Sequence, residues 1–418
     1  MRLAVITQSR DRVGGVESYL EALLPALIDQ HAVAFFSAND TISERGPIAL
    51  PPGVPALSID ADATDPLQKL RAWSPDVIFA HGLESSAIEA DLLPLAPSII
   101  AQHTYTGTCI SSSKTKSWPS PVQCERKFGP ACLAIYLPRQ CGGANPLTMA
   151  RLYLTQSARL RTLQRAAAVV TLSNHMAEEM RRNGVPADRV HVVAPFVVPS
   201  GVRATGASDS GTARLLYLGR LEPLKGVKHL LSALPAVSRS LQRPLRLIVA
   251  GDGTERQALE SQAARIARTH AGIEIQFAGW QSEEGRARLF ADADALVVPS
   301  IWPEPFGLVG LEAAVAGVPA VAFATGGIPE WLHDGENGCL APARGASADL
   351  LAKAIVRCVG DPDELRRLSE GARLSSARWT LSAHVGALND LFDVVARNAA
   401  QSCASVKPQT APESVSPC

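Results

Sequence analysis

Strand-like and helix-like segments alternate along nearly the whole of this 418-residue chain. Short runs of Val, Ile, Leu and Ala predict buried strands, and the longer amphipathic segments between them predict helices. In the first half the predicted strands are residues 3–7, 32–37, 77–81, 98–103, 169–173 and 190–194. In the second half they are residues 215–218, 245–250, 275–278, 295–299 and 320–324. This alternation indicates an α/β protein whose parallel sheets are covered by helices on both faces.

The length of the chain favours two domains, because single hydrophobic cores stop growing beyond about 300 residues. A segment rich in Gly, Ser and Thr at residues 195–213 interrupts the alternation and predicts a linker. We therefore expect doubly wound domains over residues 1–198 and 199–381. A last helix is expected over residues 382–398, followed by a disordered tail rich in Ser and Pro at residues 399–418.

The charges of the chain balance, with 40 Lys and Arg residues against 40 Asp and Glu residues. A net charge of zero excludes a strong attraction of the whole molecule to nucleic acid, which we do not expect as a partner. No apolar run reaches the roughly 18 residues that a membrane-spanning helix needs. Residues 1–7 are typical of a first strand rather than of a signal peptide, because polar residues follow them at once. We expect a cytoplasmic protein.

The most informative short segment is residues 299–319, PSIWPEPFGLVGLEAAVAGVP. A predicted strand leads into a loop that carries Glu304, and Gly307 then opens a short apolar helix that carries Glu312. The free N–H groups and the dipole at the start of that helix favour an anion such as a diphosphate. Carboxylates repel phosphate, so the two glutamates suit the hydroxyl groups beside it, on a ribose and a sugar. This pattern predicts a site for a nucleotide-linked sugar.

Two basic residues follow the predicted strand 215–218. Arg220 comes shortly after the strand, and Lys225 comes just before the expected start of the next helix. Cations at these positions can offset the negative charge that grows on a departing diphosphate. A Gly-Asp-Gly turn at residues 251–253 follows the next strand, where it either contacts the nucleotide or serves only as a tight connection.

In the first half of the chain, Gly14 and Gly15 separate the first strand from its helix and can bring the backbone close to a phosphate or an acceptor. His103 ends the strand 98–103. A lone histidine is more often structural than functional, so both interpretations stay open. His81 is a weaker candidate of the same kind. These residues are expected to meet those of the second half at the cleft where parallel strands end.

The segment from Glu304 to Glu312 resembles the Glu-x7-Glu signature of the retaining glycosyltransferases of family 4. Three further segments are similar to that family, namely LYLGRLEPLKG (216–226), LIVAGDG (247–253) and GGIPE (326–330). The resemblance is specific over residues 210–380 and looser over residues 1–200. It implies the GT-B fold, in which two Rossmann-like doubly wound domains face a central cleft. It also implies that the last helix returns to the first, acceptor-side domain.

The resemblance also implies roles for individual residues. The implied catalytic residues are Glu304, His103, Arg220 and Lys225. The implied donor-binding residues are Gly14, Gly15, Arg220, Lys225, Gly251, Gly253, Glu304, Phe306, Gly307, Leu308, Val309 and Glu312. Glu312 would accept hydrogen bonds from the ribose, Glu304 would face the sugar ring, and His103 would bond to the sugar. Backbone N–H groups from Phe306 to Val309 would hold phosphate and sugar hydroxyls.

The implied function is the transfer of a hexosyl group, with retention of configuration, from a UDP- or GDP-linked sugar such as GDP-mannose. The acceptor would be a glycan or a lipid-linked molecule, and the reaction would belong to the synthesis of cell-surface polysaccharide or glycolipid. No cofactor would be required. Two alternatives stay open. One is a nucleotide-sugar epimerase or hydrolase of the same fold, and the other is a protein that binds a nucleotide-sugar without turnover.

A polar insertion at residues 104–146 shows no clean periodicity. It contains four of the eight cysteines, at positions Cys109, Cys124, Cys132 and Cys141. Their spacings are wider than the Cys-x2-Cys pairs of ordinary zinc sites, so a structural metal, disulfides and unlinked thiols all remain open. Such a polar segment orders poorly by itself, and either two disulfides or one four-thiolate metal would fix it if the cysteines are linked.

Basic residues are concentrated in and after this insertion. Between residues 105 and 177 there are nine Lys or Arg residues against one acid, Glu125. The predicted helix 152–165 places several of these arginines beside leucines. Three interpretations of this face stay open: contact with anionic lipid, contact with the other domain, or simple solvation. Contact with lipid would place the protein on the inner face of the membrane.

Overall fold

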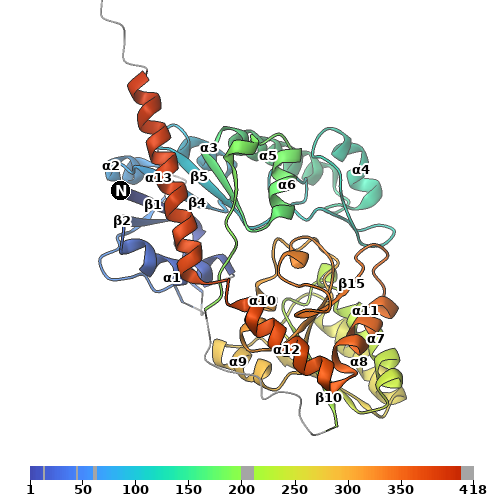
Figure 1. Cartoon of the computed structure of the whole chain (residues 1–418). Helices are drawn as coiled ribbons and strands as arrows, with labels where there is room; N and C mark the ends of the chain where they lie inside the picture. The colour runs from blue at the N-terminus through green and yellow to red at the C-terminus, as the bar shows by residue number, and fades with distance from the viewer. Residues whose placement is uncertain (13–14, 44–45, 60–63, 199–210, 406–418) are drawn as a thin grey trace, which may run out of the picture. The chain divides into compact units, whose positions relative to one another are not determined.

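The computed structural model describes residues 1–12, 15–43, 46–59, 64–198 and 211–405 (Figure 1). The chain forms two compact units. The first comprises residues 1–101, 165–169 and those from 385 onward, and the second comprises residues 102–164 and 170–384. Parallel sheets with helices between their strands organise the described residues, as the alternating sequence predicts.

Seven parallel-sheet strands come from the first half of the chain, in the order β3-β2-β1-β4-β5-β8-β9. They are β1 (Arg2–Ser9), β2 (Ala32–Asn39), β3 (Ala56–Ser58), β4 (Val77–His81), β5 (Ser98–Gln102), β8 (Ala168–Thr171) and β9 (Val190–Val192). The order reverses between β1 and β4, which is the doubly wound arrangement. Residues 3–6 of β1 are fully buried, because both faces of this parallel sheet are covered.

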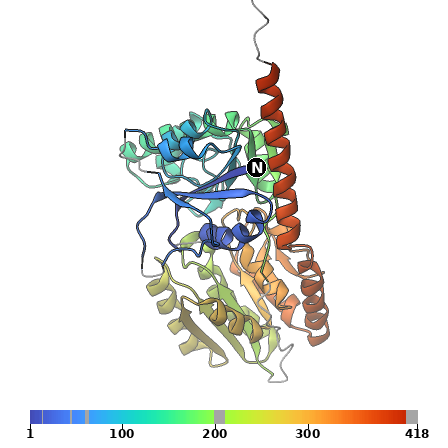
Figure 2. The ribbon, with the colours of Figure 1, turned by 90° about the vertical axis from the view of Figure 1, so that its left-hand side faces the viewer.

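Helices connect and cover these strands. They are α1 (Gly15–Ile28), α2 (Gln68–Trp73), α3 (Ser86–Leu92), α6 (Asn174–Arg182) and the long C-terminal helix α13 (Leu381–Ser405). Helix α13, drawn in red, runs beside the first sheet in both views (Figures 1 and 2). Its Phe392 ring stands edge-on to the ring of Phe79 in β4, with the ring centres 5.3 Å apart. Its Asn389 Oδ1 lies 2.9 Å from His31 Nε2. The helix extends past its predicted end at residue 398, because residues 399–405 still include good helix formers.

Six strands of the second half form a parallel sheet in the order β12-β11-β10-β13-β14-β15. They are β10 (Ala213–Leu218), β11 (Leu245–Ala250), β12 (Ile273–Gly279), β13 (Ala295–Val298), β14 (Ala320–Phe323) and β15 (Gly338–Ala341). Their helices are α7 (Val227–Leu241), α8 (Arg256–Thr269), α9 (Glu283–Ala291), α10 (Leu308–Val315), α11 (Ala348–Val359) and α12 (Pro362–Ser376). The order reverses between β10 and β13, and ligands of open α/β sheets bind beyond the strand ends at such a reversal.

The insertion folds more regularly than its sequence predicts. It contains the hairpin of β6 (Thr115–Lys116) and β7 (Val122–Gln123), then helix α4 (Ala131–Arg139), and it leads into α5 (Pro146–Arg165). A small core that includes Ile110, Phe128 and Tyr136 supports it. Lys114 and Glu179 of α6 form a buried ion pair at 2.5 Å. These contacts give the segment a small core and a buried ion pair of its own.

The part of the chain that the structure describes contains no helix that is long and apolar enough to cross a membrane.

Candidate donor-binding site

The loops after β10 and β13 meet where the order of the second sheet reverses. Gly226 has a φ of +71°, and a Cβ added there would lie 1.9 Å from the carbonyl oxygen of Pro299. The backbone N–H of Ile301 donates to the carbonyl of Leu224 at 3.0 Å. The two loops are therefore joined backbone to backbone, and only glycine fits at this contact.

The Gly-Asp-Gly turn after β11 packs against the same loop. A Cβ at Gly251 would lie 1.9 Å from the carbonyl oxygen of Gly219, and a Cβ at Gly253 would lie 2.5 Å from that of Leu221. Both glycines thus have a packing reason to lack a side chain. The predicted contact of Gly251 and Gly253 with the nucleotide stays a prediction.

Lys225 and Glu304, one from each loop, form an ion pair. The Lys225 Nζ lies 2.7 Å from Glu304 Oε1, with 20% of the lysine side chain and 7% of the glutamate side chain exposed. The same ammonium group lies 4.8 Å from the centre of the Trp302 ring. A cation held by a carboxylate and an aromatic face is fixed in position at the sheet reversal.

The backbone around Glu304 is fixed by two further segments. The N–H of Gly327 donates to the carbonyl of Glu304 at 2.7 Å. Gly326 has a φ of +56°, and a Cβ there would lie 2.2 Å from the same carbonyl oxygen. The hydroxyl of Tyr105 donates to the carbonyl of Pro303 at 2.8 Å. Glu304 is therefore held by its own backbone as well as by Lys225.

Helix α10 begins beside this loop. Gly307 is its N-cap with a φ of +98°, and no described side chain caps the helix. The N–H groups of Leu308 and Val309 stand in its first turn, where the positive end of the helix dipole favours an anion. Phe306 is buried, and its carbonyl oxygen accepts a hydrogen bond from Trp331 Nε1 at 2.6 Å.

Glu312 lies further along α10 and is paired with a residue that the sequence did not indicate. Its Oε2 lies 3.4 Å from Arg286 Nε of α9, and 32% of its side chain is exposed. Burial raises the pKa of the Glu312 carboxyl, and the nearby Arg286 opposes this shift. Arg286 lies on a partly buried helix without a motif of its own, so no local pattern indicated it.

The remaining predicted residues occupy simpler positions. Arg220 is exposed, and its carbonyl oxygen accepts a hydrogen bond from the Tyr217 hydroxyl at 2.6 Å. His103 follows β5 directly and is half-buried, and desolvation lowers its pKa to about 4. Gly15 starts α1 in the first unit, and Gly14 lies outside the described residues. The predicted meeting of these glycines with the donor site stays a prediction.

Sequence reasoning also missed the contacts that connect α6 to the segment after β14. Both carboxylate oxygens of Glu330 accept hydrogen bonds at the start of α6, from the backbone N–H of His175 at 3.1 Å and from Asn174 Nδ2 at 3.0 Å. A carboxylate at a helix N-terminus is favourable. The buried ring of Tyr105 stands edge-on to both His175 and Trp302. Sequence spacing cannot indicate such pairs.

The four cysteines of the insertion are free thiols, three of them buried. Burial raises the pKa of Cys132, and it raises the pKa of Cys141 to about 11. Within the described ranges, no three His, Cys, Asp or Glu side chains are grouped as metal ligands. A structural metal at Cys109, Cys124, Cys132 and Cys141 stays a prediction.

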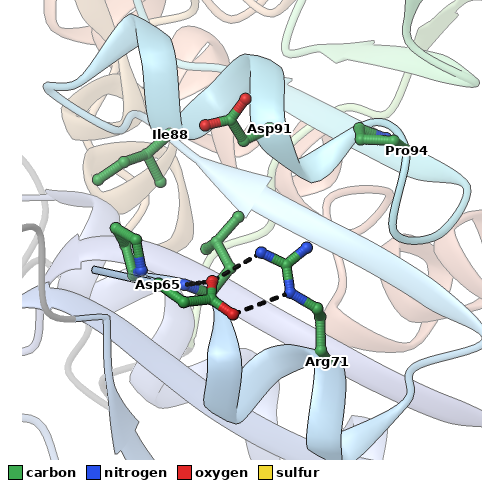
Figure 3. Close-up of a pocket in the computed structure, with 7 residues that line it drawn as sticks. Asp65, Arg71, Ile88, Asp91 and Pro94 are labelled. Carbon is green, nitrogen blue, oxygen red and sulfur yellow. Dashed lines mark hydrogen bonds and ion pairs between the residues drawn. The ribbon is translucent and has the colours of Figure 1, made fainter. Parts of the chain in front are cut away.

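The first unit contains a separate cavity of about 280 Å³. Figure 3 shows Asp65, Arg71 and Asp91 around it, with an ion pair of 2.6 Å between Arg71 and Asp65. Its walls come from the start of α2 and from α3 with the turn after it, not from the loops that follow β1 and β4. It therefore does not lie where ligands of such sheets bind.

Two family models match the chain. "Glycosyl transferases group 1" matches residues 202–375, and "Glycosyltransferase Family 4" matches residues 13–200. A glycogen synthase of Mycobacterium tuberculosis is 29% identical over 72% of this chain and 64% of its own length. A phosphatidyl-myo-inositol mannosyltransferase of Mycobacterium leprae is 35% identical over 44% of this chain and 50% of its own length. The chain thus spans less than two thirds of these relatives.

Solved structures share the fold at low identity. Sucrose-phosphate synthase from Thermosynechococcus elongatus has a TM-score of 0.69 and 19% identity, over 94% of this chain and 98% of that one. Anabaena HepE in complex with UDP-glucose has a TM-score of 0.62 and 18% identity, over 97% of this chain and 100% of that one. The predicted fold class, GT-B with two parallel-sheet α/β domains, is confirmed.

Proposed function

Because the chain belongs to the family-4 glycosyltransferases, we propose that it moves a hexosyl group from a UDP- or GDP-linked sugar to an acceptor with retention of configuration. The acceptor is a glycan or is lipid-linked, and the reaction takes place on the cytoplasmic side of a membrane. The observation that carries this proposal is the ion pair of the partly buried Lys225 with the buried Glu304 at the sheet reversal, next to the start of α10, which no described side chain caps.

The donor diphosphate binds at the start of α10 in this proposal. The N–H groups of Leu308 and Val309 donate to it, and Arg220 and Lys225 offset the charge that grows as the sugar leaves. The Lys225 ammonium has three N–H donors, and its bond to Glu304 uses one of them. The pair therefore positions Lys225 for phosphate without taking up all of its donors.

The two carboxylates recognise hydroxyl groups. Glu304 faces the transferred sugar, while Glu312 accepts hydrogen bonds from the ribose and is oriented by Arg286. The low pKa of His103 keeps its imidazole neutral near pH 7, so that one ring nitrogen can donate and the other can accept a hydrogen bond to the sugar. HepE was solved with UDP-glucose, which makes UDP-glucose the first donor to test.

Release of UDP or GDP from a panel of nucleotide-linked hexoses tests the proposal, with and without glycan and lipid-linked acceptors. Acceptor-dependent release and a product with the donor's anomeric configuration by NMR are expected. Release without acceptor would indicate a hydrolase, and a changed sugar still attached to the nucleotide would indicate an epimerase. Tight donor binding without turnover would indicate a binding protein.

A further inference from the structure

Helix α5 exposes a row of leucines and arginines. Leu147 is 81% exposed and Leu154 is 68% exposed, and Arg151 and Arg161 are also exposed. Steps of four, three and seven residues separate these four side chains, so they lie along one face of the helix. Apolar and cationic side chains alternate along this face of the helix.

The orientation of α5 is fixed by its opposite face. Met149, Leu152 and Tyr153 pack against the small core of the insertion, and Gln156 and Leu163 are buried. The outward row is therefore a constant surface of the second unit. Leu147 and Leu154 bury little apolar surface within the chain. We therefore expect another surface to cover them.

Other exposed apolar side chains lie in the same region. Of the ten large hydrophobic side chains that are exposed among the described residues, five fall between residues 118 and 154. Trp118, with 57% of its surface exposed, is at the tip of the β6–β7 hairpin, and its backbone N–H donates to the carbonyl of Arg139 at the end of α4. The exposed apolar groups of the hairpin and of α4 are thus neighbours.

Basic residues outnumber acidic ones in this region. Helix α5 contains no acidic residue, and residues 105–177 carry nine Lys or Arg residues against Glu125 alone. The chain as a whole has a net charge of zero, so this local excess is offset elsewhere. A partner that matches it must be anionic and must also accept leucine side chains.

We infer that the α5 row of Leu147, Arg151, Leu154 and Arg161 docks on the surface of an anionic lipid bilayer. Leucines enter the boundary of the acyl chains while arginines between them stay at the lipid phosphates. Nucleic acid would satisfy the arginines and leave the leucines in water. This docking surface would hold the proposed glycosyltransferase at the membrane, and it can be tested without measuring catalysis.

Flotation of the full chain with lipid vesicles tests the inference. The wild-type protein is expected to float with vesicles of phosphatidylcholine and phosphatidylglycerol, much less with phosphatidylcholine alone, and less as salt is raised. Leu147→Ser/Leu154→Ser and Arg151→Gln/Arg161→Gln should each reduce binding to the anionic vesicles about tenfold. All four side chains are exposed, so neither variant should unfold the protein, which the melting temperature checks.

Matched control variants lie on other helices. Leu374→Ser changes an exposed leucine of α12, and Arg265→Gln/Arg268→Gln changes two exposed arginines of α8. Both controls should float like the wild type. Failure of the wild type to float with anionic vesicles at low salt would overturn the inference, as would wild-type flotation of the double serine variant. A wild-type dimer that this variant converts to a monomer, with flotation unchanged, would instead assign the row to a second copy of the chain.

The test is separable from the proposed function. Nucleotide release with a water-soluble acceptor needs no vesicle, so it should be unchanged in Leu147→Ser/Leu154→Ser. Loss of flotation with unchanged release supports the docking surface, and absence of any release with normal flotation counts only against the proposed transferase activity.

Discussion

The two carboxylates of the candidate site are each held by a basic side chain, but in different surroundings. Glu304 is almost fully buried at 2.7 Å from Lys225. About a third of the Glu312 side chain is exposed to solvent, and its Oε2 lies 3.4 Å from Arg286 Nε. A buried pair is fixed before any ligand arrives, whereas a half-exposed carboxylate can exchange part of its solvation for a ligand hydroxyl.

We expect the two glutamates to affect different kinetic constants. Glu312→Ala should raise the donor KM about tenfold with little change in kcat, because ribose hydrogen bonds stabilise ground and transition states alike. Glu304→Ala should lower kcat by roughly 10²–10³, because in the proposed mode Glu304 faces the reacting sugar. Steady-state kinetics measure both effects, with the exposed Glu283→Ala of α9 as control. Negligible effects of both changes would contradict the assignment.

The second residue-scale prediction concerns pH. The pKa of His103 is about 4 in the folded protein and about 6.5 in an unfolded chain. Between these values the unfolded chain binds more protons, so stability is complete above about pH 6.5 and decreases as pH falls toward 4. His103→Asn should reduce this dependence, while the lowered pKa values of His175 and His384 are common to both proteins.

Urea-unfolding midpoints of the wild type and His103→Asn at about pH 7 and pH 5 measure the difference. The wild-type midpoint should fall more than that of the variant between the two pH values. Equal shifts in both proteins would show that the pKa of His103 is not lowered in the folded protein.

Single residues were predicted from their own neighbours, and their partners were not. Gly and apolar residues around Glu304, Glu312 and Lys225 identified these positions as a site. Tyr105 was not found, because its hydrogen-bond acceptor lies 198 residues away along the chain. Arg286 was not found for the same reason, since pairing between two helices leaves no periodic signal in either of them.

At the scale of elements, long buried runs were predicted well. Strands β4 and β11 have the predicted ends, because continuous apolar runs define them. The strands β3, β6 and β7 were missed, since two or three residues show no periodicity. Helix α4 was also missed, because Pro138 lies inside it and polar loops surround it.

The predicted insertion supports the site through Tyr105, which leads to an element-scale prediction. Tyr105→Phe removes the bond to the Pro303 carbonyl next to Glu304 and should lower kcat about five- to tenfold, with about 1 kcal/mol of stability lost. Donor KM should change little, because Tyr105 positions the loop and does not contact the diphosphate in the proposed mode. Kinetics and urea unfolding measure these effects.

Tyr136→Phe is the matched control for this prediction. Its hydroxyl donates to the Gly142 carbonyl at 2.6 Å within the same insertion, so the change removes a comparable bond away from Glu304. It should cost similar stability and leave kcat unchanged. A positioning role for Tyr105 would be wrong if both variants had the same kcat.

At the scale of the whole molecule, the compact units differ from the division that the linker suggested. Residues 102–164 and 170–198 are grouped with the second unit, because Tyr105 and the start of α6 contact the segments after β13 and β14. The predicted boundary at residue 198 marks a change of sheet, and such contacts cannot be read from composition. The two sheets themselves follow from the alternation of strands and helices.

The last prediction is that the whole protein transfers sugar without a divalent metal. Arg220, Lys225 and the start of α10 supply positive charge for the diphosphate from the chain itself. We expect full activity after exhaustive treatment with a chelator, measured as nucleotide release, and no gain on adding magnesium. Complete loss of activity, restored by magnesium while the melting temperature stays constant, would contradict it. Loss of activity together with a lower melting temperature would instead indicate a structural metal at Cys109, Cys124, Cys132 and Cys141, which elemental analysis and thiol titration of the native protein measure directly.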